Sequence, residues 1–129
     1  MRSGGGRGAV NLSVHHVAVQ VNDLDVARNF YVGVLGFCVT REQPHSLWLD
    51  AGGVIVMLEL CRGVVEHGDW STERVGPHVV AFSIAAADRS VWQGRLRDNG
   101  IVVDHESQFT LYFRDPFGAR LALSHYPDG

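Results

Sequence analysis

The chain repeats one pattern in its two halves, and this repeat limits its fold more than any other feature. His16 opens an apolar segment in the first half, and His78 opens a similar segment in the second. An acidic turn and a helix-like segment follow each one, ending at Gly36 and at Gly100, and three short strand-like segments come next. We therefore predict an α+β fold made of two tandem β-α-β-β-β modules with cupped mixed sheets.

The residue pattern also places the elements of each module. Asn22 or Asp23 is expected to cap a first helix in which apolar residues recur at helical spacing up to Leu35. A second helix is predicted over 88–98. Apolar runs bounded by turn residues predict the strands, which cover residues 13–21, 37–41, 46–49, 54–61, 78–84, 101–104, 110–114 and 119–124.

Composition suggests where the folded part begins. Four glycines among the first eight residues predict a disordered leader over 1–12. The remainder has the size of one domain, which we expect over 13–126. Within it the predicted parts are module one over 13–61, a linker over 62–77 that is long enough to lie over a pocket, and module two over 78–126.

The composition argues against nucleic acid and membrane partners and against disulfide bonds. Lys and Arg total 11 against 14 Asp and Glu, and they are scattered, so we expect no nucleic acid partner. No apolar run approaches the roughly 20 residues of a membrane span, so we expect no membrane partner and a cytoplasmic protein. Cys38 and Cys61 form no Cys-x-x-Cys pair, which predicts reduced thiols.

Strand parity predicts which side chains share the concave face of the cup. Side chains alternate across a strand, and the apolar set of each strand should pack on the helices. The side chains left to face the cup are His16, Ala18 and Gln20 in the first strand and Ile55, Met57, Glu59 and Cys61 in the fourth. In the fifth strand, equivalence with the first predicts that His78, Val80, Phe82 and Ile84 face inward.

Three motifs then suggest a family. They are His-Val-Ala-Val at 16–19 with Val-Asn-Asp-Leu at 21–24, Phe-Tyr at 30–31 through Val-Leu-Gly-Phe at 34–37, and Tyr-Phe-Arg-Asp-Pro-Phe-Gly at 112–118. On these motifs the chain resembles the vicinal oxygen chelate superfamily. That superfamily contains glyoxalases, extradiol dioxygenases, fosfomycin-modifying enzymes and bleomycin-binding proteins. The resemblance covers about 13–126.

The resemblance implies a metal site with one ligand from each of the first, fourth, fifth and eighth strands. These positions map onto His16, Glu59, His78 and Ala122, and alanine cannot bind a metal. The three remaining donors would leave coordination positions open for water and substrate. Nitrogen and oxygen donors of this kind suit iron, manganese, zinc, nickel or cobalt, and Glu59 would then be the candidate catalytic base.

Two functions follow from the resemblance. One is a metal-dependent lyase, isomerase or dioxygenase that acts on a small oxygen-chelating substrate, with Ala122 counting against the dioxygenase. The other is a metal-free protein of the bleomycin-resistance type that binds a small molecule or drug, which Ala122 favours. Either would be a homodimer whose cups are completed across the interface. The predicted pocket contains Gln20, Trp48, Met57, Cys61, Phe82, Tyr112 and Ala122.

Each of these residues also has a purely structural interpretation. A histidine at the start of a strand is often a half-buried side chain bonded to the backbone. An aromatic residue in a strand is often an ordinary core residue, and a lone cysteine such as Cys61 is often passive. The sequence leaves these alternatives open.

Overall fold

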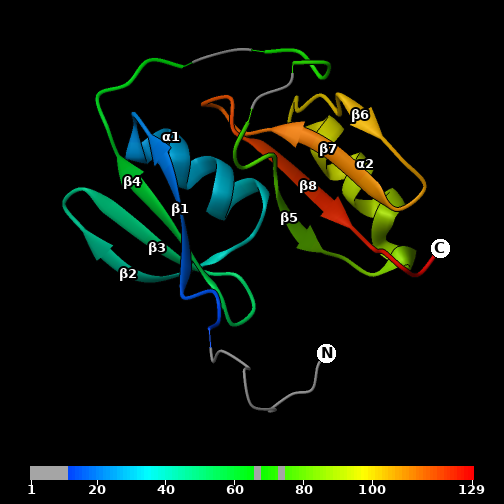
Figure 1. Ribbon diagram of the computed structural model, residues 1–129, viewed down its shortest axis with the longest axis horizontal. Coiled ribbons are helices and arrows are strands. Elements are labelled where there is room, and N and C mark those ends of the chain that lie inside the picture. The colour runs from blue at the N-terminus through cyan, green and yellow to red at the C-terminus, as the bar shows by residue number, and fades with distance from the viewer. Residues whose placement is uncertain (1–11, 66–67, 73–74) are drawn as a thin grey trace.

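The computed structural model describes residues 12–65, 68–72 and 75–129. Two four-stranded sheets lie side by side, with the helices behind them (Figure 1). The first sheet contains β1 (His16–Val21), β2 (Cys38–Gln43), β3 (Ser46–Asp50) and β4 (Ile55–Leu60). The second contains β5 (Val80–Ser83), β6 (His105–Glu106), β7 (Thr110–Arg114) and β8 (Arg120–Ser124). The helices are α1 (Leu24–Arg28), the π-helix η1 (Asn29–Val34), the 3₁₀-helix η2 (Ala86–Asp88) and α2 (Arg89–Asp98).

The two sheets have the same topology. The strand order is β1-β4-β3-β2 in the first sheet and β5-β8-β7-β6 in the second. β1 is parallel to β4 and β5 is parallel to β8, while the other neighbours are antiparallel. This match confirms the predicted α+β fold with two β-α-β-β-β modules. Nearly all of the predicted leader, residues 1–11, lies outside the described residues.

The first helix begins at the predicted cap and changes type partway along. Oδ1 of Asp23 accepts two backbone N–H bonds from the first turn, each 3.0 Å long. These bonds satisfy donors that have no partner within the helix. The chain then widens into η1, where the Leu35 N–H donates to the Phe30 carbonyl. The helical segment ends at Gly36, whose φ of 84° favours glycine.

One predicted strand is absent. Residues 101–104 form no strand, and the strand that pairs with β7 is the two-residue β6. Ile101 and Val103 instead pack against the hydrophobic core. Their alternation predicted a strand, but it serves to fill the core. The predictions over 110–114 and 119–124 are confirmed as β7 and β8.

One hydrophobic core joins the two modules. The Phe30 ring lies 6.5 Å from the Phe113 ring of β7, and the Phe37 ring lies 4.8 Å from the Phe82 ring of β5, centroid to centroid. Buried side chains from both sheets belong to the same cluster. The modules are therefore held together by their helix-facing sides, which leaves the other face of each sheet available for a ligand. Within the described residues, no helix has the length and hydropathy of a membrane span.

Candidate functional site

The concave face of the first sheet carries the side chains that strand parity placed there. Across β1, β4 and β3, one row contains Ala18, Met57 and Trp48, and the next contains Gln20, Glu59 and Ser46. His16 and Gln20 are exposed, whereas Val56 and Leu58 on the helix side of β4 are buried. The parity prediction is confirmed for β1 and β4.

His16 stands at the open edge of this face. Its Nδ1 lies 2.9 Å from the Nδ1 of His15, so in the neutral pair one ring donates and the other accepts. The His16 ring also stacks on Trp48, with centroids 6.5 Å apart and an interplanar angle of 18°. A ligand on this face would contact an imidazole and an indole.

The strand registers show which positions of the two modules correspond. Ala18 pairs with Met57 in the first sheet, and Ala81 pairs with Ala122 in the second. Ile55 and Arg120 are the first residues of β4 and β8 after the hairpin turn, and Met57 and Ala122 each lie two residues further along. Met57, one row away from Glu59, is therefore the counterpart of Ala122.

The same match corrects the fifth strand. Val79, which has the parity of the exposed Ala81, is the counterpart of His16. His78 has the parity of Phe82, and Phe82 packs against the core together with Val80 and Ile84. The prediction that Phe82 faces the cup is wrong, because a shift of one residue along a strand moves a side chain to the other face. His78 lies before β5, and its ring reaches Arg120 on the concave face.

These positions do not suit a divalent metal. Of the four that correspond between modules, His16 offers an imidazole, Met57 offers only a soft thioether, and the other two are aliphatic. Within the described part of the chain, no group of three or more His, Cys, Asp or Glu side chains could hold an ion. The predicted set of His16, Glu59 and His78 is not brought together.

The second sheet differs because a side chain from the inter-module segment lies on its concave face. The Trp70 ring is parallel to the His105 ring, with centroids 4.0 Å apart and an angle of 7°, and lies 4.7 Å from the Tyr112 ring. The Arg120 guanidinium carbon lies 4.5 Å from the centroid of the same indole. Tyr112 shares its face with Ala122, which is fully buried. Trp70 therefore occupies this half of the cup.

Asp69 fixes the turn that presents Trp70. Its Oδ1 accepts bonds from the Ser71 hydroxyl at 2.7 Å, the Ser71 N–H at 3.0 Å and the Thr72 hydroxyl at 3.2 Å. These bonds, the Ser71 hydroxyl first among them, stabilise the ionised carboxylate and lower the pKa of Asp69 below its ordinary value. The turn is held by hydrogen bonds within itself.

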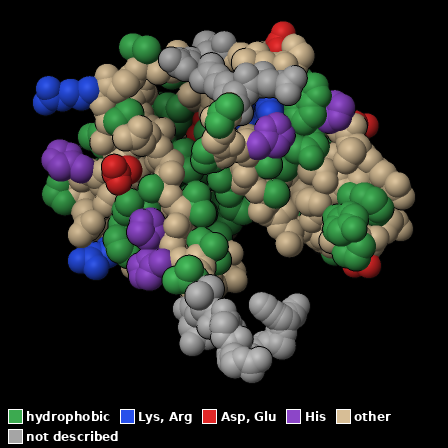
Figure 2. Space-filling model, viewed as in Figure 1, with side chains coloured by type: hydrophobic (Ala, Val, Ile, Leu, Met, Phe, Trp, Pro, Cys, Tyr) green, Lys and Arg blue, Asp and Glu red, His purple; other side chains and the backbone are tan. Residues whose placement is uncertain are grey.

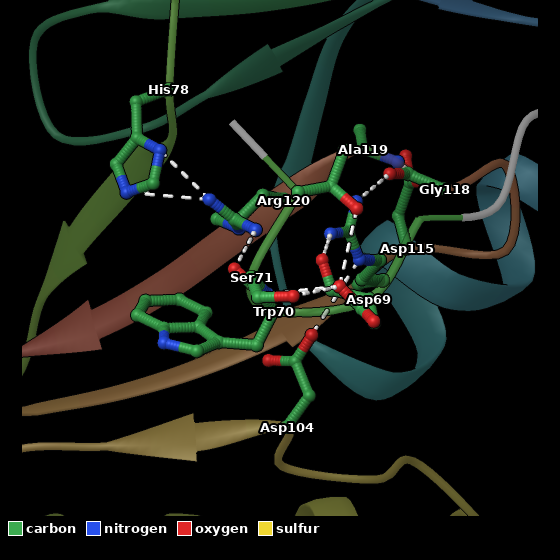
Figure 3. Close-up of polar contacts among 11 residues, drawn as sticks. Asp69, Trp70, Ser71, His78, Asp104, Asp115, Gly118, Ala119 and Arg120 are labelled. Carbon is green, nitrogen blue, oxygen red and sulfur yellow. Dashed lines mark hydrogen bonds and ion pairs between the residues drawn. The ribbon is translucent and has the colours of Figure 1, made fainter. Parts of the chain in front are cut away.

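Two arginines lie opposite each other on this face, and Figure 3 shows one of them, Arg120, between His78 and Trp70. Arg114 in β7 is the register partner of Arg120 in β8. The Arg114 Nε lies 3.5 Å from Oδ2 of Asp104, an ion pair too poorly aligned to be a hydrogen bond. Arg120 donates from Nη1 to Nδ1 of His78 at 2.8 Å and from Nη2 to the Trp70 carbonyl at 3.2 Å. Because arginine can only donate, Nδ1 of His78 is the acceptor in this contact.

Asp115 links the modules next to this face. The Tyr31 hydroxyl donates to its Oδ2 at 2.7 Å, and the N–H groups of Phe117 and Ala119 donate to its Oδ1 at 2.9 and 2.8 Å. Burial raises the pKa of Asp115 above its ordinary value, although these hydrogen bonds act in the opposite direction. Burial, and then the charge of Asp115, also raise the pKa of Tyr31. The pair is a buried structural contact.

Two cavities border Arg114, of which the smaller also borders Arg120, and their linings differ in charge. The larger, about 820 Å³, has the carboxylates Asp69, Asp104 and Asp115 in its wall. The smaller, about 400 Å³, is lined by His78, Arg114, Arg120, Gln20 and Thr72, among others. In the space-filling view the surface is hollowed between the two halves, and hydrophobic side chains gather there (Figure 2). Both volumes fall in the range of small-molecule sites.

Sequence reasoning did not find Trp70, Arg114 or Arg120. A lone tryptophan in a polar, glycine-containing segment was the available signal for Trp70. Among the predicted pocket residues, Cys61 follows β4, is half-buried and accepts a 3.4 Å bond from the Gly63 N–H. It lines a separate cavity of about 510 Å³.

The chain belongs to the Glyoxalase/Bleomycin resistance protein/Dioxygenase superfamily, whose family model matches residues 13–123. It is 26% identical over 120 residues to "Metallothiol transferase FosB" of Bacillus licheniformis, covering 87% of this chain and 74% of that protein. The match to the glyoxalase/dioxygenase of Nostoc punctiforme has a TM-score of 0.80 at 20% identity and covers 99% of both chains. The lactoylglutathione lyase of Agrobacterium tumefaciens gives a TM-score of 0.70 at 21% identity over 88% of this chain and 93% of that one. At these identities the two structures establish the fold.

Proposed function

We propose that this protein binds a small molecule without a metal, as the bleomycin-resistance type of the superfamily does. One observation carries the proposal: three of the four corresponding positions on the concave faces hold Met57, Val79 and Ala122, which do not suit a divalent ion. The faces still provide stacking and hydrogen-bonding groups, among them Trp48 and Gln20. Such a surface can bind an organic molecule without reacting with it.

We further propose that the complete site forms between two copies of the chain. The concave residues of β1 and β5 are exposed in the single chain, as His16 and Ala81 illustrate. β1 and β5 are also edge strands of their sheets. A homodimer that places the first sheet of one copy against the second sheet of another would cover both. Light scattering at micromolar concentration should give the dimer mass, and a monomer mass would reject this part of the proposal.

A metal-dependent lyase, isomerase or dioxygenase is the second candidate. It is favoured by His16 and Glu59, which share the concave face of the first sheet. The name of the Bacillus licheniformis relative also describes a metallothiol transferase. Iron, manganese, zinc, nickel or cobalt would be the cofactor, and Glu59 the catalytic base.

Elemental analysis of the freshly purified full chain separates the two candidates. The proposed function predicts far less than one metal ion per chain after exposure to these ions and desalting, with His16→Ala no different from wild type. His15→Ala is the matched control, because it removes the neighbouring imidazole and leaves the concave face intact. Stoichiometric metal in wild type and in His15→Ala, lost in His16→Ala, would reject the binding protein and support the enzyme.

A further inference from the structure

The smaller cavity has an unusual arrangement of positive charge. Arg114 and Arg120 are register partners in an antiparallel pair, where like charges oppose each other. Both line the cavity of about 400 Å³, together with His78. Among the described residues, no carboxylate is part of its lining. Two adjacent guanidinium groups therefore line a space without a carboxylate from those residues, although Arg114 pairs with Asp104 outside it. Arg114 also donates to the Gly118 and Asp69 carbonyls, at 2.8 and 3.3 Å.

The hydrogen bonds of Arg120 leave part of its donor capacity unused. A guanidinium carries five N–H donors in a rigid fork. Two of the Arg120 bonds go to the His78 ring and the Trp70 carbonyl. Its Nε is buried and has no partner within the described residues. Because this Nε is covered, the donors that remain for an acceptor in the cavity are the second N–H groups of Nη1 and Nη2.

Trp70 holds this guanidinium in position. The Arg120 carbon lies 4.5 Å from the centroid of the Trp70 ring, which packs in turn on His105. Contact with the indole covers part of the cation and leaves N–H groups in the plane of the fork able to donate. On the other arginine, Asp104 lies to one side and itself lines the larger cavity rather than this one.

We propose that this cavity is a binding site for a small oxyanion group, a phosphate or a carboxylate, held by Arg120 and Arg114. Paired guanidinium groups match the geometry of such an anion and bind it with charge-assisted hydrogen bonds. The inference goes beyond the proposed function, because it names the chemical group that is bound and the two arginines that bind it; of the groups named there, the cavity contains Gln20 and not Trp48. His78 serves in it as the acceptor that orients Arg120.

The test is calorimetric titration of inorganic phosphate into the full chain at constant ionic strength. Wild type should bind, and Arg120→Ala should weaken binding about tenfold or more, since each charge-assisted contact is strong. Arg120→Lys keeps the charge and loses the fork, so it should fall between the two. Arg97→Ala is the matched control, because Arg97 lies exposed on α2 and pairs with Asp98, and it should bind as wild type does.

Acetate, titrated in parallel, identifies the kind of anion. Binding of phosphate alone supports a tetrahedral group, and comparable binding of acetate supports a carboxylate; both require the loss in Arg120→Ala. If circular dichroism shows that Arg120→Ala does not fold, Arg120→Lys and His78→Ala give the comparison. Failure of wild type to bind either anion, or equal weakening in Arg97→Ala, would overturn the proposal. Neither result bears on metal content or dimer mass.

Discussion

The concave faces of the two modules belong to sheets of the same topology but differ in what covers them. On the first, His16 and Gln20 are exposed and Trp48 is half-buried. On the second, Trp70 packs against His105, and Ala122 is fully buried. The fold constrains the helix-facing side of each sheet, because that side builds the common core. The opposite side is free to diverge.

The two concave faces also differ in the charged groups that they carry. The first face offers the imidazole of His16 and the carboxylate of Glu59, and the second offers two guanidinium groups, Arg114 and Arg120. A ligand enclosed between a first face and a second face would therefore contact different chemistry at its two ends. Four predictions test how far this difference extends.

The largest effect is expected where the two modules do not differ, in the common core. Phe113→Ala should lower the free energy of unfolding by about 3–5 kcal/mol, because it empties a fully buried ring site. Urea unfolding should remain a single transition, since Phe113 contacts Phe30 of the first module. Phe109→Ala, a half-buried ring at the molecule's edge, is the control and should cost less. Two separate transitions would show that the modules unfold independently.

The next effect concerns the contact between modules. Tyr31→Phe leaves Oδ2 of Asp115 without its donor and should cost about 1–3 kcal/mol at neutral pH. The pKa of Asp115 is raised in the fold, so ionisation of this group destabilises the protein as pH rises above the ordinary value of about 3.9. Loss of the Tyr31 bond raises that pKa further, and the deficit of the variant should shrink as the pH is lowered.

Urea titrations of Tyr31→Phe at pH 7 and pH 5 measure this change. The exposed Tyr126→Phe is the control and should match wild type at both values. A deficit that is independent of pH would show that the hydroxyl acts through packing alone.

A smaller effect compares the two faces directly. Trp70→Ala should cost about 1–2 kcal/mol, from lost ring stacking and the lost contact with Arg120. It should also speed amide exchange in β7 and β8, because their face loses its cover. Trp48→Ala alters the concave face of the first sheet and should leave amide exchange in β7 and β8 unchanged. Equal protection of these strands in both variants would mean that Trp70 does not cover the second face.

The smallest effect distinguishes the two histidines that open the repeat. His16→Ala should change stability by less than about 0.5 kcal/mol, because the side chain is exposed. His78→Ala should cost about 1 kcal/mol, because Arg120 loses an acceptor. Thermal melts of both variants provide the measurement. Equal melting temperatures would remove the structural distinction between these residues.

Much of the fold could be predicted because it depends on local pattern. The alternation in 110–114 and 119–124 gave β7 and β8, and Asp23 caps the first helix as expected. The strand over 101–104 could not be placed, because apolar alternation has the same appearance when it fills a core. The side chains on the concave face of the first sheet were predicted, because the alternation of β1 was assigned correctly.

The sequence by itself determined that two like modules exist, which residues alternate in each strand, and which superfamily the chain resembles. These properties are set by neighbours along the chain. Tertiary structure alone decided that Val79 rather than His78 matches His16, that Trp70 covers the second face, and that Arg114 stands beside Arg120. Register is decided by pairing with a distant strand, and a shift of one residue reverses the face that every side chain takes.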